Sequence, residues 1–557
     1  MAERATDPVA SLRASVERVA AKLDAGAATR LTLERPPKAE LGDYSTNAAM
    51  LLAPGVGAAP REVAERLRSG LESELGSAAD RIEVAGPGFI NLHLSDRWHR
   101  EAVGSLLAAG ERLGAAVPDR AERVLVEFVS ANPTGPVTAA AGRGAAFGDS
   151  LARLLTLAGH EVEREYYLND AGSQVRLFAE SIAARIRGAE PPEEGYGGAY
   201  ITELARELGA RGIGADDLDA LARHGIDSMR IRIEATLERF GVRYDSWFSE
   251  HSLHESGRVA AVVELLRERG HVYESEGATW FRTSELGDDK DRVLVRADGE
   301  PTYFVGDVAY HRDKLERGIE RMIDPLGADH HGYVPRMKAA IAALGADPDR
   351  YEAPIMQLVS IVEGGQRARM SKRRGEFVTL DELIDDIGVD AARFFMLGRS
   401  HDTTLDLDLE LARSASQENP VFYVQYAHAR IASILRKAAA EGAAPAAEEG
   451  ADEDEIAAAA IDTQGLSVGA EPSERALVRR LLELPGEVVA AAERRAPHRI
   501  CAYAMATAAD FHAFYRDCRV VGAGEGTEAA RLGLAVAARR TIARSLSLVG
   551  VSAPQRM

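Results

Sequence analysis

The sequence predicts a multidomain α/β protein, in which a doubly wound (Rossmann-like) domain lies between a small α+β N-terminal domain and an all-α C-terminal bundle. Three observations along the 557-residue chain predict this arrangement. A helical pattern near the N-terminus is followed by two strand patterns around a Gly-Pro-Gly turn. Apolar strands then alternate with helices, as in a parallel sheet covered by helices. Beyond about residue 408 the pattern is almost purely helical.

Length and composition are those of an ordinary globular protein. A chain of this length is expected to form roughly three or four domains, and its 46% hydrophobic and 28% charged residues are usual values. No run of about 18 apolar residues occurs, so we expect no membrane partner. The first 20 residues lack the apolar core of a secretory signal. Only Cys501 and Cys518 occur, which fits a reducing cytoplasm and argues against disulfide or zinc frameworks.

The N-terminal domain is expected over residues 1–112. Residues 8–24 have the apolar periodicity of a helix, and RIEVAGPGFINLHLS (81–95) indicates two short strands around a tight turn. Together they suggest a small α+β domain.

The central domain is expected over residues 120–405, with an insertion at about 180–290. The insertion is mostly helical, and GATWFRTSELGDDKDRVLVRADG (277–299) indicates a hairpin. The stretches that alternate in the doubly wound pattern are 124–130, 143–159, 161–167, 302–305 and 355–361, of which 143–159 is helical.

A strand-to-helix turn, ANPTGPVTAAAGRGAAFGD (131–149), is the first candidate site. In a doubly wound sheet, ligands lie at the carboxyl ends of the strands, where helix N-termini offer free N–H groups to phosphates. The alternative is a plain Gly/Pro connection without a ligand.

A basic stretch, GGQRARMSKRRGEF (364–377), is the second candidate. It lies between a strand and a helix, and its glycines and clustered cations suit a mobile loop that closes over a triphosphate. A solvated basic surface loop is the alternative.

The C-terminal bundle is expected over residues 408–557. An acidic segment (441–455) holds seven acidic residues and no basic one, which indicates a solvated linker or mobile loop. Residues 471–557 hold thirteen arginines, no lysine and nine acidic residues, a local charge of +4 in a chain whose net charge is −20. Arginine binds phosphate in bidentate fashion, so this part suits a polyanion. An ordinary arginine-rich helical surface is the alternative.

Several blocks of the chain resemble those of one known family. They are EFVSANPTGP…GRGAAFGD, EYYLNDAGSQ, GDDKDRVLVRADG, GADHHGYVPR, ARMSKRRGEFVTLDELIDDIGVDAARFF and NPVFYVQYAHARI. In this order they resemble bacterial arginyl-tRNA synthetases, which are class I synthetases. The resemblance runs from residue 42 to the C-terminus. It implies an arginine–tRNA ligase that activates arginine with ATP as an adenylate and transfers it to the 3′ end of tRNA-Arg.

The resemblance also implies the ligands and the setting. We expect ATP to arrive with Mg²⁺, and no metal cage made by the protein alone. The expected partners are tRNA-Arg, arginine and ATP, without DNA or a membrane. Members of the family are mostly cytoplasmic monomers, which is the expectation here.

The resemblance assigns arginine binding to two places. Glu127, Ser130 and Asn132 match the residues at a strand end that grip the amino acid. Tyr303 and Asp307 are four residues apart on a predicted helical turn and therefore share a face. A carboxylate facing a guanidinium selects arginine, because a paired fork rejects side chains without those donors. For Asp307 a surface carboxylate is the alternative.

ATP binding is assigned to the two candidate loops and to a third segment. In the third, Asp329, His330 and His331 match residues near the ribose or adenine, although one histidine of the pair could instead belong to the core. In the basic loop, Arg369, Met370, Ser371 and Lys372 match the mobile signature of the family. Lys372 is expected to stabilise the charge that develops on the leaving pyrophosphate, together with Mg²⁺.

The chain departs from the family at residues 138–141, where the His-x-Gly-His signature is expected. Here Thr138, Ala139, Ala140 and Ala141 precede Gly142. Thr138 can still offer a hydroxyl, so it stays a candidate catalytic residue. Each phosphate contact that is lost could cost about 10²- to 10³-fold in rate.

Besides a deliberate change of these residues, two interpretations of this departure stay open. In the first, Arg143, the helix N-terminus and the arginines around Lys372 hold the phosphates, and the enzyme is active. In the second, the chain is a catalytically impaired paralogue that binds arginine, ATP or tRNA without turnover.

Both ends of the chain are expected to bind tRNA. In the N-terminal domain, Phe89 and Asn91 match an aromatic ring and an amide that read an unstacked base, although Phe89 could also be a core residue. The C-terminal bundle resembles an anticodon-binding domain. Its candidate residues are Tyr423, Tyr426, Arg430, Arg556 and Met557.

Overall fold

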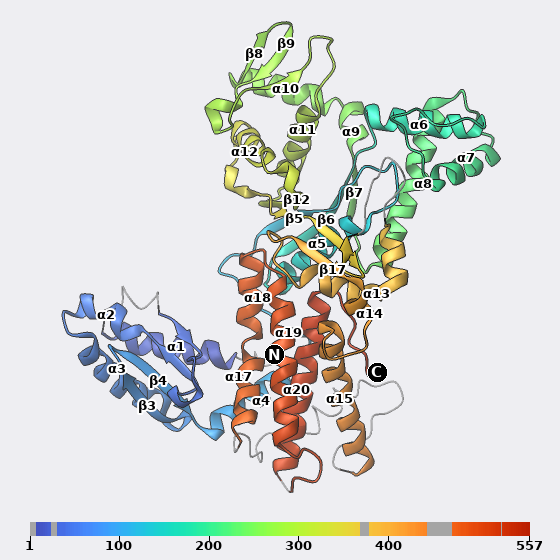
Figure 1. Ribbon diagram of the computed structural model, residues 1–557. Helices are drawn as coiled ribbons and strands as arrows, with labels where there is room; N and C mark the ends of the chain where they lie inside the picture. Colours follow the sequence, from blue (N-terminus) through green and yellow to red (C-terminus); the bar gives the residue numbers. More distant parts are fainter. Residues whose placement is uncertain (1–6, 24–30, 368–377, 443–470, 525) are drawn as a thin grey trace.

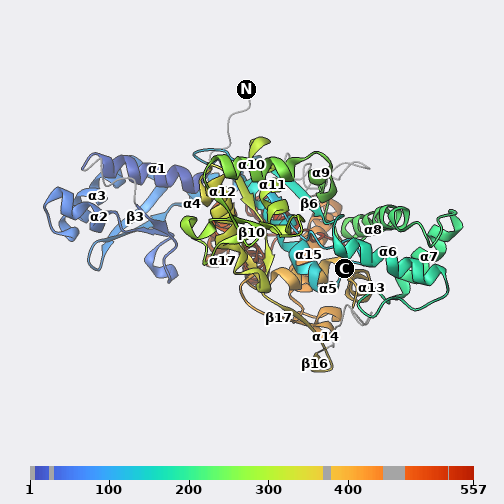
Figure 2. The same cartoon turned by 90° about the horizontal axis from the view of Figure 1, so that it is seen from above.

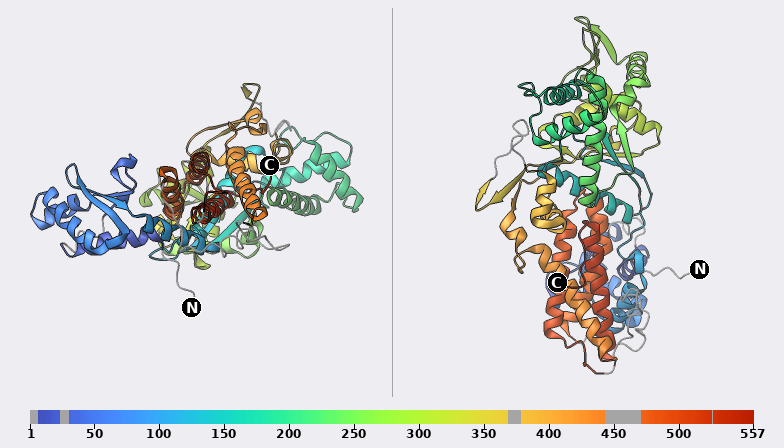
Figure 3. Two further views of the ribbon diagram at one scale, coloured as in Figure 1. Left: turned by 90° about the horizontal axis from the view of Figure 1, so that it is seen from below. Right: turned by 90° about the vertical axis from the view of Figure 1, so that its right-hand side faces the viewer.

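The computed structural model describes residues 7–23, 31–367, 378–442, 471–524 and 526–557. The N-terminal domain lies at one side of the molecule and helices α6–α8 lie at the opposite side (Figures 1 and 2). The central sheet lies between them, above a bundle of long C-terminal helices, as the side view of Figure 3 also shows.

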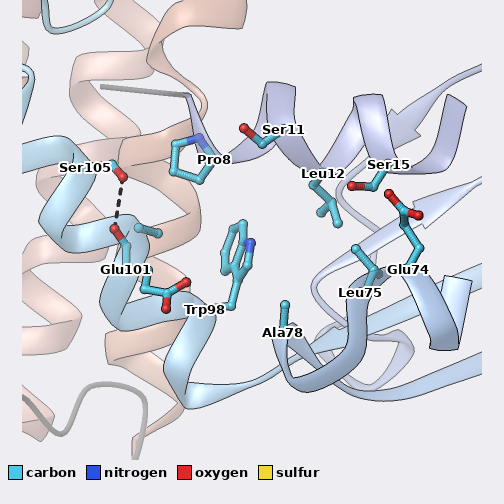
Figure 4. Close-up of a pocket in the computed structure, with 11 residues that line it drawn as sticks. Pro8, Ser11, Leu12, Ser15, Glu74, Leu75, Ala78, Trp98, Glu101 and Ser105 are labelled. Carbon is cyan, nitrogen blue, oxygen red and sulfur yellow. Dashed lines mark hydrogen bonds between the residues drawn. The ribbon is translucent and has the colours of Figure 1, made fainter. Parts of the chain in front are cut away.

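The N-terminal domain packs helices on an antiparallel sheet of order β1-β2-β4-β3. The two predicted strands around the Gly-Pro-Gly turn are β3 and β4, and the predicted N-terminal helix is α1. A crevice of about 290 Å³ lies between α1 and α4 and is lined by Trp98 and Glu101 (Figure 4). The elements are α1 (Pro8–Ala21), β1 (Leu33–Glu34), η2 (Ala39–Leu41), β2 (Tyr44–Thr46), α2 (Ala48–Val56), α3 (Pro60–Leu75), η3 (Gly76–Ala78), β3 (Ala79–Ala85), β4 (Phe89–Leu94), α4 (Asp96–Ala108) and η4 (Gly110–Arg112).

The central sheet has five parallel strands in the order β13-β11-β5-β6-β7. Strand β5 is the middle one, and its residues 124–126 are fully buried, as expected for a strand covered on both faces. Helices cover the sheet, which confirms the doubly wound prediction. Its elements are β5 (Arg123–Glu127), α5 (Ala139–Leu157), β6 (Glu161–Leu168), β7 (Ser246–Ser249), β11 (Arg321–Ile323) and β13 (Tyr351–Glu352).

The stretch 302–305 does not continue the alternation as a strand. Helix α11 (Tyr303–Glu316) begins there, after the N-cap Thr302. Phe304, Val305 and Val308 are buried with helical rather than alternating spacing. The stretch 355–361 is divided between two small sheets. These involve β12 (Leu326–Gly327), β14 (Ile355–Met356), β15 (Val359–Glu363), β16 (Gln366–Arg367) and β17 (Leu405–Asp408).

The insertion is helical and carries the predicted hairpin. Strands β9 and β10 pair antiparallel, and β8 extends them to a three-stranded sheet. The elements of the insertion and of the adjoining lobe are α6 (Ser173–Ile186), α7 (Ala199–Ala210), α8 (Leu218–Arg239), α9 (Glu250–Glu255), α10 (Arg258–Glu268), β8 (Val272–Ser275), β9 (Ala278–Phe281), η5 (Thr283–Leu286), β10 (Arg292–Val295), η6 (Ala328–His330), α12 (Tyr333–Ala343) and η7 (Pro348–Arg350).

The C-terminal part is all-α, as predicted. From residue 443 the predicted acidic loop lies outside the described residues. Within the described ranges, no helix is both long and apolar enough to span a membrane. Helix α13 (Leu380–Leu397) precedes this part, whose helices are α14 (Leu409–Arg413), α15 (Pro420–Ala440), α17 (Pro472–Leu482), α18 (Leu484–Glu493), α19 (His498–Asp517) and α20 (Thr527–Leu548).

Arg393 of α13 ties the central domain to the end of the bundle. Its guanidinium is fully buried and donates to Phe240 O, to Val549 O and to Asp149 Oδ2. Gly550 has a φ of +68°, and an added Cβ there would lie 2.2 Å from the guanidinium carbon of Arg393. Only glycine fits this close approach.

Candidate active site

A strained turn at the end of β5 carries Ser130 to the carboxyl edge of the sheet. Val129 and Ser130 have positive φ values of 69° and 39°, which is rare outside glycine and most strained for a β-branched residue. Such strain persists only where neighbouring contacts enforce it. Four hydrogen bonds do so: Tyr244 Oη to Phe128 O (3.0 Å), Tyr166 Oη to Ala131 O (2.8 Å), Asn169 Nδ2 to Ser130 O (3.0 Å) and Tyr167 N to Ser130 Oγ (3.1 Å).

A cluster of carboxyl groups, called the carboxylate pocket here, lies beside this turn. Glu127 comes from the end of β5, Glu250 follows directly after β7, and Asp307 comes from the first turns of α11. The Tyr333 hydroxyl donates to Asp307 Oδ2. A Cβ added to Gly306 would lie 3.7 Å from Glu250 Oε1, so α11 packs closely against this carboxylate.

The surroundings of two of these carboxyl groups disfavour the charged form. Burial, together with repulsion from Glu127 and Glu250, raises the pKa of Asp307 well above its usual value. Burial and the nearby charge of Asp170 raise the pKa of Glu250 to about 7. Among the described residues, the buried Oε2 atom of Glu250 has no hydrogen-bond partner. Leaving a buried acceptor unpaired is costly, so the pocket suits a cation with several N–H donors, such as a guanidinium.

Tyr303 and Asn132 lie at the exposed side of this region. Tyr303 is one helical turn before Asp307 and is 57% exposed. Its hydroxyl lies 3.5 Å from Ser173 Oγ, near the loop that follows β6. Asn132 is exposed two residues beyond Ser130. The structure therefore brings Glu127 and Asp307 together in one pocket and leaves Tyr303 and Asn132 accessible.

Thr138 caps the helix that follows the turn. Its hydroxyl accepts a hydrogen bond from Ala141 N at 3.3 Å, the N-cap interaction that threonine typically makes. The backbone forms a bridge between Thr138 and Thr379, which is itself the N-cap of α13. Helices α5 and α13 therefore begin side by side.

The N-terminus of α5 has fewer free N–H groups than the sequence suggests. Ala139 N donates to Val378 O, while Ala141 N and Gly142 N donate to the oxygen atoms of Thr138. Of the first four N–H groups, that of Ala140 alone has no partner among the described residues. Gly142 is buried, and a Cβ there would lie 2.9 Å from Leu380, so this position allows α5 to pack closely on α13.

The expectation that Arg143 holds phosphate groups is wrong. Its side chain is 2% exposed, and its guanidinium donates to Gln357 O, Thr403 O and Ser400 O at 2.9, 2.9 and 2.8 Å. These carbonyl groups occupy both donors of Nη1 and one of Nη2, and burial lowers the pKa of Arg143. Arg143 anchors loops around α5.

The predicted signature residues Arg369, Met370, Ser371 and Lys372 lie outside the described residues, between Arg367 and Thr379. Arg367 of β16 pairs with Asp406 of β17, and Thr379 bridges to Thr138. The two described borders of the basic stretch are thus fixed to the domain that carries the turn.

Asp329, His330 and His331 are all exposed, so neither histidine belongs to the core. They lie at η6, after β12, where His330 Nε2 is 3.5 Å from Asp329 Oδ2. A cavity of about 670 Å³ is lined by Asp329 and His330 together with Tyr333, Arg336 and Arg292. Because Tyr333 also contacts Asp307, this cavity adjoins the carboxylate pocket.

In the N-terminal domain, Phe89 is 41% exposed, so it is not a core residue. Asn91 is 4% exposed, and its Oδ1 accepts a hydrogen bond from Ser45 Oγ at 2.8 Å. The role of these residues in reading a base stays a prediction.

At the far end of the bundle, the structure brings together most of the predicted C-terminal residues. Arg430 stacks on Tyr426 and Tyr515, with its guanidinium carbon 5.5 and 4.7 Å from the ring centroids. Arg556 and Met557 line the same cavity of about 550 Å³, with Arg436 and Lys437. Tyr423 lies one turn away and contacts His512 edge-on. Half-buried aromatic rings and cations that line one cavity are suited to unstacked nucleotides.

Sequence reasoning missed several residues of the carboxylate pocket. Glu250, Tyr167 and Tyr333 were not predicted, although Tyr167 belongs to the EYYLND block. Burial, and then the charges of Glu250, Asp307 and Glu127, raise the pKa of Tyr167, so its hydroxyl feels all three carboxylates. Glu250 follows directly after a sheet strand, as Glu127 ends one, and this shared position was the available signal.

Family models match three parts of the chain. A model described as arginyl tRNA synthetase N terminal domain matches residues 10–94, one described as tRNA synthetases class I (R), catalytic domain, matches residues 216–431, and one described as DALR anticodon binding domain matches residues 424–557. The turn with Thr138 lies between the first two matches.

Curated relatives match the chain almost from end to end. A protein of Carboxydothermus hydrogenoformans named arginine–tRNA ligase is 45% identical over 559 residues, covering 98% of both chains. One of Frankia alni with the same name is 46% identical, covering 96% of both. Among solved structures, the arginyl-tRNA synthetase of Thermus thermophilus has a TM-score of 0.74 at 26% identity, covering 98% of this chain and 99% of that one. That of Plasmodium falciparum has the same TM-score at 16% identity, covering 98% of each chain, and shows the fold alone.

Proposed function

This chain belongs to the arginyl-tRNA synthetase family and is a class I arginine–tRNA ligase, and we propose that it selects arginine through the paired carboxylates of Asp307 and Glu250. The observation that carries the proposal is the Glu250 Oε2 atom, which has no hydrogen-bond partner in the described part of the chain, near the half-buried carboxylate of Asp307. A guanidinium supplies the donors and the charge that this pair lacks.

The other end of the amino acid is assigned to the edge of β5. Glu127, Ser130 and Asn132 are proposed to hold the ammonium and carboxylate groups of arginine. The strained turn supports this, because it fixes Ser130 by four surrounding hydrogen bonds. Tyr303 is proposed to cover the bound side chain from the exposed side.

ATP with Mg²⁺ is proposed to bind between the turn and the exposed segment at η6. Asp329, His330 and His331 are proposed for the nucleoside, and Ala140, Ala141 and Gly142 for the surface on which it lies. The free N–H group of Ala140 and the hydroxyl of Thr138 are the phosphate donors that the turn offers. Because these donors are few, we assign most of the binding of the phosphate groups to Lys372. Arg369, Met370 and Ser371 are proposed to shape the loop that carries it.

The tRNA is proposed to contact both ends of the chain. Phe89 and Asn91 serve the outer corner of the tRNA, and the cavity around Arg430 serves the anticodon. Tyr423, Tyr426, Arg556 and Met557 belong to this second site. We propose that the enzyme acts as a monomer in the cytoplasm; its two cysteines are unpaired, in keeping with a reducing compartment.

The test is charging of tRNA-Arg with labelled arginine in the presence of ATP and Mg²⁺, with ATP–pyrophosphate exchange measured in parallel. Charging by the native chain, and its loss in Lys372→Ala, is the expected result. Binding of arginine and tRNA without either reaction would overturn the proposal and favour an impaired paralogue instead.

A further inference from the structure

A buried lysine is hydrogen-bonded to one carboxylate of the carboxylate pocket. Lys314 is on α11, seven residues after Asp307, and its side chain is 0% exposed. Its Nζ atom is 2.7 Å from Glu127 Oε2 and 3.2 Å from Asp324 Oδ1. It also lies 4.3 Å from the ring centroid of Tyr310, over the ring face. A buried ammonium is rare unless it is paired in this way.

The charges around Lys314 come from four elements. Glu127 ends β5, Asp324 follows β11, Glu165 lies on β6, and His311 and Tyr310 lie on α11 itself. His311 Nε2 is 3.2 Å from Asp324 Oδ2, and Tyr310 donates to Glu165 Oε1 at 2.6 Å. Glu165 is in addition paired with Arg317 at 2.8 Å. Lys314 is therefore the hydrogen-bonded cation of both Glu127 and Asp324, and Asp324 has His311 as a second partner.

This arrangement divides the buried carboxylates into two groups. Glu127 and Asp324, called the rear carboxylates here, pair with Lys314. Asp307 and Glu250, called the front carboxylates, have no basic side chain hydrogen-bonded to them among the described residues. Burial raises the pKa of Glu127, and the Lys314 ammonium opposes that rise. Lys314 contacts only Oε2, and 14% of the Glu127 side chain stays exposed. One side of this carboxylate is thus left accessible to a ligand.

We propose that Lys314 is a positioning residue for arginine binding, which holds Glu127 in its orientation and in its charged state from behind the pocket. This inference rests on the proposed role of Glu127 in gripping the amino acid. Lys314 touches neither substrate nor reacting atoms. Its effect on arginine passes through Glu127, whereas its effect on ATP should be small.

The test compares Lys314→Met with the native enzyme in steady-state charging. Because methionine keeps most of the volume and removes the charge, the KM for arginine is expected to rise about tenfold or more, and the KM for ATP to change by less than about threefold. The loss should also depend on pH. Without the ammonium, Glu127 protonates at higher pH, so between pH 6.5 and 9 the arginine KM of Lys314→Met should improve more than that of the native enzyme, which varies with pH through Glu250. A purely structural defect would leave the ratio of the two KM values independent of pH.

Two further variants make the test decisive. Lys338→Met removes a surface lysine that pairs with Asp349 on the same lobe, and it should leave every constant unchanged. If Lys314→Met does not fold, the double variant Lys314→Met/Asp324→Asn removes one buried charge of each sign and still leaves Glu127 without its cation. It is expected to show the same rise in arginine KM. An arginine KM within about twofold of the native value in either folded variant would overturn the inference. Failure of the native chain to charge tRNA would instead overturn the proposed function.

Discussion

At the scale of single residues, two front carboxylates distinguish a guanidinium from an ammonium. Asp307 and Glu250 lie on different helices, α11 and α9, so one bound group must reach both. A planar guanidinium presents several donors in a fixed fork, whereas an ammonium is a compact and strongly hydrated point charge. The pocket therefore favours arginine over lysine, because the planar fork offers each carboxylate its own donors and gives up less hydration than an ammonium.

Replacement of Asp307 tests this selection directly. Asp307→Asn removes one charge and one acceptor while the Tyr333 hydroxyl keeps a partner. We expect the KM for arginine to rise about 30- to 1000-fold, equivalent to about 2–4 kcal/mol, as for one half of a buried charge pair. Steady-state charging measures this. Asp349→Asn, on an exposed carboxylate, is the matched control and should behave as the native enzyme.

Glu250 should make arginine affinity depend on pH. In the empty pocket its pKa is about 7, because burial favours the protonated form. A bound guanidinium favours the carboxylate, so affinity should rise from pH 6 to pH 8, and binding at pH 6.5 should release protons. Calorimetry in two buffers of different ionisation enthalpy counts them. The proton count should fall in Glu250→Gln, and an unchanged count would contradict this role.

The same carboxyl group also has a predictable effect on stability. Because its folded pKa lies above that of an unfolded glutamate, about 4.3, its contribution is complete below pH 4 and is lost as the pH rises through 7. The melting temperature of the ligand-free native protein should therefore fall between pH 5 and 8 more than that of Glu250→Gln. Saturating arginine at pH 8 should restore it in the native protein only.

At the scale of elements, α5 and α13 form one unit around the turn. They begin at bridged threonines, and Arg143 fixes α5 to the loops at 357 and 400–403. Arg143→Met should leave three carbonyl groups without their donor. We expect a large fall in melting temperature, from a loss of about 3–5 kcal/mol. The KM for ATP of the remaining folded enzyme should be nearly native. A selective defect in ATP binding would show instead that Arg143 serves phosphate.

Helices and strands could be predicted where the apolar periodicity extends over many residues, but the predictions failed where strands are short. The sheet of the central domain followed from the buried runs at 124–130 and 161–167. Strand β11 has only three residues, and the apolar start of α11 was placed in the strand alternation because both faces of that helix are buried. Among the residues of the candidate site, too, some could be predicted from the sequence and others could not. The resemblance to the family indicated Asp307, whereas Glu250 and Lys314 acquire their roles only through neighbours that are distant in the sequence.

At the scale of the whole molecule, the N-terminal domain is locked to the bundle by a buried ion pair. Asp43 Oδ1 accepts from Arg479 Nη1 at 2.7 Å, and Asp43 Oδ2 accepts from Leu94 N. Burial alone would raise the pKa of Asp43, but His99, Leu94 N and Arg479 outweigh it and lower the pKa to about 2. The pair thus stays charged at every pH at which the enzyme is used.

Breaking this pair should affect tRNA more than arginine. In Asp43→Asn the buried Arg479 loses its counter-charge, and we expect the N-terminal domain to dock less firmly. The KM for tRNA should rise about three- to tenfold, with the KM for arginine nearly unchanged, and proteolysis between the two domains should accelerate. Lys38→Met, on an exposed lysine of the same domain, serves as the control. Equal changes in both KM values would point to a general loss of structure.

The contact of Arg393 with Phe240 and Val549 has a consequence for how the protein is made. A growing chain has completed the strand-to-helix turn, the carboxylate pocket and the signature loop long before residue 549 is added. Until then the Arg393 guanidinium lacks one of its carbonyl acceptors, and Gly550 is not yet in place to cover it. Packing around Arg393 can therefore be completed only at the last stage of translation. Unfinished chains of this synthetase should for that reason not acquire its finished active site.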